Sequence, residues 1–108
     1  MHLSFENKEI RSICEDESMA VNLYGPEVIE KLKNRLTDMI AATTVSEIPP
    51  IGNPREIEGN PHTHYVIDLC DGFHICVSAN HLKPPLLENG NLDWPNVSRI
   101  KILQITKE

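Results

Sequence analysis

The sequence has few aromatic residues, few cysteines and no long apolar run. Only 5% of the 108 residues are aromatic whereas 40% are hydrophobic, so the core must consist mainly of Ile, Leu and Val. A chain of this length suits one packed core, and we expect a single domain over residues 1–108. No stretch approaches the roughly 20 apolar residues that a membrane span needs, so no contact with a membrane is expected.

Cysteines are too few and too irregularly spaced for a disulfide framework. Cys14, Cys70 and Cys76 cannot all pair within one chain, and no CxxC motif is present. Residues 1–8 lack the apolar run of a signal peptide. These observations predict reduced thiols and a cytoplasmic location.

Basic residues are fewer than acidic ones, because 10 Lys and Arg stand against 16 Asp and Glu. The resulting formal charge of −6 does not favour nucleic-acid binding, since affinity for phosphate comes from Lys and Arg contacts. Any binding of this kind requires a local basic patch.

The N-terminal half has the pattern of one strand and two helices. A short strand is expected at residues 2–5, and Asn7 is a typical N-cap for a helix that ends near residues 16–18. A second helix is predicted from Pro26 to about Thr43, because proline is favoured at the first helical position. Its apolar stripe consists of Ile29, Leu32, Leu36 and Met39, and its opposite face carries Lys31, Lys33 and Arg35.

The C-terminal half changes to the period of two that is typical of strands. Turn-forming residues at 46–54 predict a loop, and residues 64–70 and 73–78 predict a hairpin. A two-residue turn would pair Leu69 with His74 and mix the two faces. A three-residue loop at 70–72 instead pairs Leu69 with Phe73 and makes one face wholly apolar, so we favour it.

The rest of the chain predicts a long surface excursion and a closing strand. Residues 80–95 contain several prolines and are expected to be anchored by Leu86, Leu87 and Trp94. Residues 97–105 place apolar side chains on both parities, which is typical of a central or bulged strand.

The segments SFENKEIRSICED, KLKNRLTDMIAATTVSEI and LDWPNVSRIKILQI together resemble motifs of the RelE/ParE superfamily of bacterial toxins, nearest its HigB-like killer proteins. The segment SFENKEIRSICED is similar to their opening F-x-x-K-x-(I/L)-x-x-(I/L), and KLKNRLTDMIAATTVSEI is similar to their basic second helix and the turn after it. The ending LDWPNVSRIKILQI resembles LDW-x-x-V-(T/S)-x-I-x-I-(L/I)-x-I of one branch. The resemblance implies an α+β fold with two N-terminal helices packed on a small, mostly antiparallel sheet.

The same resemblance implies a function and partners. Members of this family are toxins of type II toxin–antitoxin systems that cleave mRNA in the ribosomal A site, without a metal or cofactor. A helix-turn-helix antitoxin, HigA-like for this branch, neutralises them. The chain is therefore expected to be an mRNA endonuclease whose partners are such an antitoxin, the ribosome and mRNA.

The residues at the family's catalytic positions differ in this chain. In NPREIEGNPHT, Arg55 stands where the family has His, and His62 stands where it has its second Lys. His74 takes the place of the hairpin Arg, and the usual closing Tyr-His is missing. His64 has the same strand parity as His74. We expect an atypical catalytic site of Arg55, His62, His64 and His74, with Lys31, Lys33 and Arg35 contacting RNA or antitoxin.

Three alternatives remain open at this point. Four side chains of the hairpin region have zinc-binding types, namely His62, His64, His74 and Cys76. The chain could instead be a binding or regulatory protein that keeps the fold without catalysis and acts through an antitoxin or another protein. The third alternative is gyrase inhibition, the activity of ParE-type toxins, but no specific feature of the sequence supports it.

Overall fold

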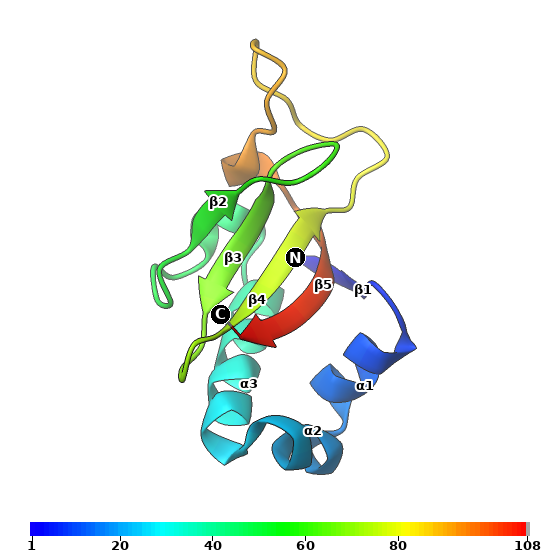
Figure 1. The fold of residues 1–108 in the computed structure, drawn as a ribbon. Coiled ribbons are helices and arrows are strands. Elements are labelled where there is room, and N and C mark those ends of the chain that lie inside the picture. Colours follow the sequence, from blue (N-terminus) through cyan, green and yellow to red (C-terminus); the bar gives the residue numbers. More distant parts are fainter. Residues whose placement is uncertain (108) are drawn as a thin grey trace.

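The computed structural model describes residues 1–107 and has an α+β fold. A strand and three helices come first, and four strands follow (Figure 1). The elements are β1 (His2–Phe5), α1 (Lys8–Glu15), α2 (Glu17–Tyr24), α3 (Pro26–Ala41), β2 (Arg55–Ile57), β3 (His64–Asp68), β4 (Phe73–Ala79) and β5 (Arg99–Lys107). Short 3-10 turns lie at Val45–Glu47 and Trp94–Asn96.

The five strands form one mixed sheet in the order β1-β5-β4-β3-β2. β1 pairs in parallel with β5, and the other three neighbouring pairs are antiparallel, which confirms a mostly antiparallel sheet. No helix among the described residues is long and apolar enough to cross a bilayer.

The number of helices differs from the prediction of two, because residues 17–24 form the additional helix α2. Asp16 ends α1, and its carboxylate also accepts a hydrogen bond of 3.2 Å from the Met19 N–H, which caps α2. Gly25, with φ 89°, then allows the turn into α3. Residues 16–18, which predicted the end of the first helix, therefore also begin α2. The bounds of α3 are close to the predicted ones.

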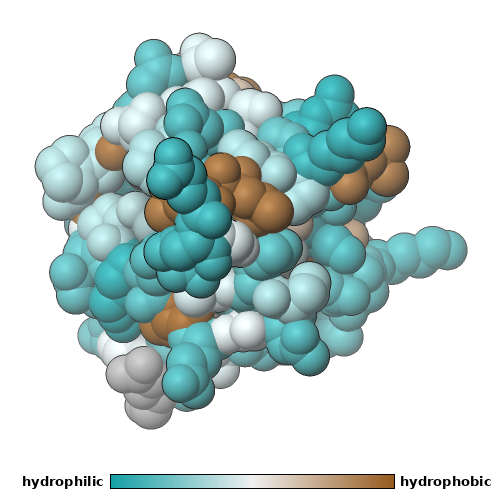
Figure 2. All heavy atoms as spheres, turned by 90° about the horizontal axis from the view of Figure 1, so that it is seen from above, coloured by the Kyte–Doolittle hydropathy of each residue, from teal (hydrophilic) through white to brown (hydrophobic). Residues whose placement is uncertain are grey.

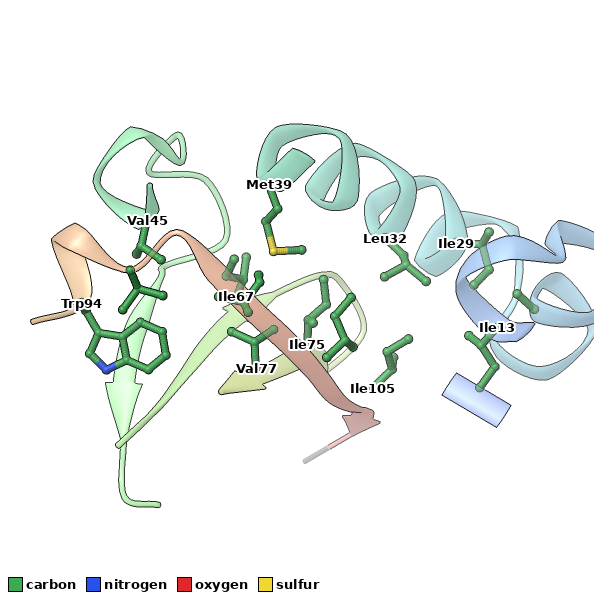
Figure 3. Close-up of a cluster of buried hydrophobic side chains, with 14 of the residues drawn as sticks. Ile13, Ile29, Leu32, Met39, Val45, Ile67, Ile75, Val77, Trp94 and Ile105 are labelled. Carbon is green, nitrogen blue, oxygen red and sulfur yellow. The ribbon is translucent and has the colours of Figure 1, made fainter. Parts of the chain in front are cut away.

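The hydrophobic core lies between α3 and one face of the sheet. Figure 3 shows Leu32 and Met39 of α3 pointing toward Ile67, Ile75 and Val77 of the central strands. All five side chains are almost completely buried. Complete burial of an aliphatic side chain of this size contributes roughly 1.5–3 kcal/mol to stability. The apolar stripe predicted for this helix therefore does face the sheet.

The β3–β4 hairpin has the strand pairing that the apolar face predicts. Ile67 lies opposite Ile75, and the Leu69 N–H donates to the Phe73 carbonyl over 2.8 Å. Gly72 has φ 82°, as expected for the loop at 70–72, and Asp71 also has a positive φ of 54°. Asp71 and Gly72 are the central residues of a tight turn inside this three-residue loop, which the Phe73 N–H closes by donating to the Cys70 carbonyl over 2.9 Å.

β5 is an interior strand of the sheet, between β1 and β4, and contains a bulge. The pairing with β4 shifts between Cys76, opposite Gln104, and Val77, opposite Ile102. The extra residue, Leu103, explains why apolar side chains occur on both parities of β5, because Ile102 and Ile105 both reach the core. The prediction of a central or bulged strand is confirmed.

Residues 80–93 form an arm that extends beyond the sheet (Figure 1). Its tip is closed by a bridge between Leu86 and Leu92. Trp94 anchors its end as predicted, since the ring is buried and Nε1 donates to Thr63 Oγ1 over 2.8 Å. Leu86 and Leu87 do not anchor it, because about half of each side chain is exposed. Figure 2, which looks down on this end of the molecule, shows separate hydrophobic patches within a mostly hydrophilic surface.

Candidate functional site

The sheet face away from α3, here called the distal face, carries the polar side chains of the hairpin. Asp68 and His74 are direct partners across β3 and β4, as the preferred turn predicts. Arg55 enters the same face from β2, where it lies opposite Val66. The strand register therefore places Arg55, His64, Asp68, His74 and Cys76 on one side of the sheet.

A pocket of about 560 Å³ lies at one end of the distal face. The β2–β3 loop, the ends of β3 and β4, and β5 form its walls. The polar side chains that line it include Glu6, His62, His64, Cys76, Lys101 and Gln104. We call it the His62–His64 pocket, because it contains two of the four side chains predicted to be catalytic.

Two polar contacts organise this pocket. His64 Nδ1 lies 3.9 Å from Cys76 Sγ, and Lys101 Nζ lies 3.9 Å from Glu6 Oε2. Burial raises the pKa of the Cys76 thiol, so this thiol remains protonated at neutral pH. Lys101 keeps part of its side chain in contact with solvent, so an anion can reach its ammonium group in competition with the Glu6 carboxylate.

The other two predicted catalytic residues form a second group farther along the sheet. Arg55 Nη1 lies 3.1 Å from Asp68 Oδ1 and also donates to the Asn53 carbonyl over 3.0 Å. His74, which is 8% exposed, lies opposite Asp68. Neither Arg55 nor His74 lines the His62–His64 pocket.

The separation between the two groups follows from strand geometry. Four residues at about 3.3 Å each place His64 and Asp68 about 13 Å apart along β3. The buried side chains of Val66 and Cys76 lie between them on the same face. One phosphate group is too small to contact both groups, so the four predicted residues do not form a single catalytic cluster.

The basic residues of α3 do not form one exposed patch. Lys31 and Lys33 are exposed as predicted, and Lys33 Nζ lies 3.2 Å from Glu17 of α2. Arg35 is only 9% exposed, so the prediction that it lies on the solvent face is wrong. It pairs with Asp38 over 3.0 Å, because one helical turn brings the two side chains together at the margin of the buried face.

Several lining residues were not identified from the sequence. Lys101 lies on the distal face because it pairs with Ser78 of β4, and Glu6 follows β1 directly. The bulge in β5 removes the simple alternation that would have indicated which way Lys101 points. Glu6 and Lys101 are 95 positions apart in the sequence, and only the parallel pairing of β1 with β5 brings them together.

The geometry required by the zinc alternative is not found in residues 1–107. No three His, Cys, Asp or Glu side chains in this part of the chain are grouped so that they could hold a metal ion. His74 belongs to the group around Asp68 and does not line the pocket with His62, His64 and Cys76. The distal face therefore offers imidazole, ammonium and guanidinium groups to a ligand.

Comparison with known proteins does not identify a family for this chain. A scan against protein-family models gave no match, and searches of curated proteins and of solved structures found no similar protein.

Proposed function

We propose that the chain is the toxin of a type II toxin–antitoxin pair and a ribosome-dependent mRNA endonuclease that uses the His62–His64 pocket. The observation that carries this proposal is the convergence of two imidazoles and one ammonium group on a single pocket of an acidic chain. The order of a strand, helices and an antiparallel hairpin also agrees with the RelE/ParE resemblance.

RNA cleavage without a metal requires three tasks that these groups suit. The 2′-oxygen of the RNA attacks the adjacent phosphorus and loses its proton, while the bond from phosphorus to the 5′-oxygen breaks. The leaving oxygen takes up a proton, and the products are a 2′,3′-cyclic phosphate and a 5′-hydroxyl. Imidazole exchanges protons near neutral pH, and the Lys101 charge stabilises the phosphorane.

The Arg55–Asp68–His74 group has a different place in this proposal. Asp68 and His74 lie about 13 Å from His64 along β3. The group therefore contacts the RNA backbone away from the bond that breaks. Arg55 supplies a guanidinium that can hold a phosphate through two donors. Lys31 and Lys33, exposed on α3, are the proposed contacts for a helix-turn-helix antitoxin or for ribosomal RNA.

The test is cleavage of mRNA on programmed ribosomes by the wild-type chain and by single alanine variants. We expect His62→Ala and His64→Ala each to slow cleavage by about 100-fold or more, which is the usual loss for an acid–base or charge-stabilising group. His2→Ala is the matched control, because His2 is exposed and lines neither group, and it should leave the rate of cleavage unchanged. A wild-type chain that leaves mRNA intact would contradict the proposal.

A second candidate is a binding protein that keeps this fold without catalysis. The division of the four predicted catalytic residues between two groups favours it. Such a protein binds a helix-turn-helix partner and leaves mRNA uncut. Co-purification with the product of the adjacent reading frame, measured beside the cleavage assay, separates the two candidates.

A further inference from the structure

The His64 ring is held between two neighbours inside the pocket. A methyl group placed on Gly59 would lie 2.5 Å from His64 Cδ2 and 2.7 Å from Cγ, so the Gly59 backbone lies directly against this edge of the ring. The opposite edge presents Nδ1 to Cys76 Sγ at 3.9 Å. With both edges occupied, Nε2 and Cε1 are the ring atoms left for the pocket.

The neutral thiol of Cys76 favours one of the two tautomers of the His64 ring. Cys76 is 3% exposed, and burial raises the pKa of its thiol, so the group at this contact is S–H. A thiol sulfur is a much poorer acceptor than an imidazole nitrogen, so with a neutral ring the better hydrogen bond runs from the Cys76 S–H to Nδ1 of His64. A neutral imidazole that accepts at Nδ1 carries its hydrogen on Nε2.

We infer that Cys76 is a positioning residue that selects the His64 tautomer with its hydrogen on Nε2, directed into the pocket. In this form His64 donates a hydrogen bond to the phosphate and does not remove the proton of the 2′-hydroxyl. His62, the other imidazole of the pocket, then receives that proton, and the leaving 5′-oxygen takes its proton from a water molecule. The state of the ring is a property of the folded chain, whereas these two catalytic roles rest on the proposed function.

The ring state can be measured without any activity, by NMR of the full chain labelled with ¹⁵N-histidine. At about pH 7.5 the wild-type His64 should show an unprotonated Nδ1 and a protonated Nε2. Cys76→Ser keeps a donor and should preserve this tautomer, whereas Cys76→Val should give a mixture of both. Cys76→Ala serves the same purpose if the valine variant does not fold. A proton on Nδ1 in the wild type, or identical spectra for all variants, would overturn the inference.

The division of roles is tested by glutamine variants in the ribosome assay. A glutamine side chain has an N–H donor but is a poor proton acceptor. His64→Gln should therefore stay within about tenfold of the wild-type rate, whereas His62→Gln should lose about 100-fold or more. Equal losses would contradict the assigned roles. If the wild type does not cleave mRNA, the proposed function fails, and the NMR result still decides whether Cys76 positions the ring.

Discussion

Arg55 and Asp68 form an ion pair between β2 and β3, with 3.1 Å from Nη1 to Oδ1. Asp68 is also the cross-strand partner of His74 on β4. Both members of the pair remain partly exposed, with 34% and 44% of their side chains accessible. The carboxylate therefore competes with any phosphate that approaches Arg55.

Replacing Asp68 with Asn should release Arg55 for a phosphate. We expect binding of a single-stranded RNA oligonucleotide to strengthen by about two- to fivefold, since an exposed ion pair contributes at most about 1 kcal/mol. For the same reason the free energy of unfolding should change by less than about 1 kcal/mol. Fluorescence anisotropy at fixed salt measures the affinity. The double variant Arg55→Ala with Asp68→Asn is the control, and a gain that persists in it would exclude Arg55 as the cause.

Arg35 should matter for stability and not for surface contacts. Its guanidinium is buried and paired with Asp38, so Arg35→Ala removes packing and leaves a partly buried carboxylate without its partner. We expect a loss of about 2–4 kcal/mol in urea unfolding. Lys33→Ala, whose ion pair with Glu17 is exposed, should cost less than about 1 kcal/mol. Similar losses for the two variants would show that the Arg35 pair has no special role in the fold.

Two glycines with nearly equal φ angles provide a matched test of a close contact. Gly52 and Gly90 have φ values of 84° and 86°, but only Gly52 lies against other atoms. A methyl group there would be 2.4 Å from the Asp68 carbonyl oxygen. Gly90→Ala should cost about 1–2 kcal/mol from the left-handed backbone alone, and Gly52→Ala should cost more. Thermal unfolding of both variants measures the difference, and equal costs would contradict the close approach.

Stability should fall between about pH 7.5 and pH 5.5 through His81. Its Nε2 accepts hydrogen bonds from the backbone N–H groups of Ser98 and Arg99, over 3.1 and 3.2 Å. Burial, with a smaller effect of the Arg99 charge, lowers the pKa of His81 below 6.5. Below that pH the unfolded chain binds a proton that the native chain resists, so the free energy of unfolding decreases as the pH falls.

Replacing His81 with Gln should flatten this dependence, as measured by urea unfolding at the two pH values. His2→Gln is the control and should keep the wild-type slope. Glu47 does not interfere in this window, because hydrogen bonds, chiefly from the Thr43 backbone N–H, lower the pKa of its carboxyl group. The contribution of Glu47 is present above its ordinary pKa of 4.5 and is lost only at more acid pH. An unchanged slope in His81→Gln would assign the effect to another group.

Local patterns predicted α3 and the β3–β4 pairing, because each depends only on residues that are close together in the sequence. The apolar stripe of α3 follows from 3.6 residues per turn, and the hairpin register follows from keeping Leu69, Phe73 and Ile75 on one face. The same patterns missed α2, since Asp16 looks like a helix end while its side chain caps the next helix. Arg35 was misplaced because periodicity does not show which neighbour covers a side chain.

The sequence by itself determined the α+β class, the long third helix, the polar face of the hairpin and the interior position of β5. These follow from hydrophobic periodicity and turn chemistry over short distances. Only the tertiary structure decided that His62 and His64 share a pocket with Glu6 and Lys101 while His74 lies elsewhere. The positions of Glu6 and Lys101 in this pocket depend on the parallel pairing of β1 with β5 and on the bulge at Leu103. Both join residues far apart in the chain, and local side-chain preferences do not encode such pairings.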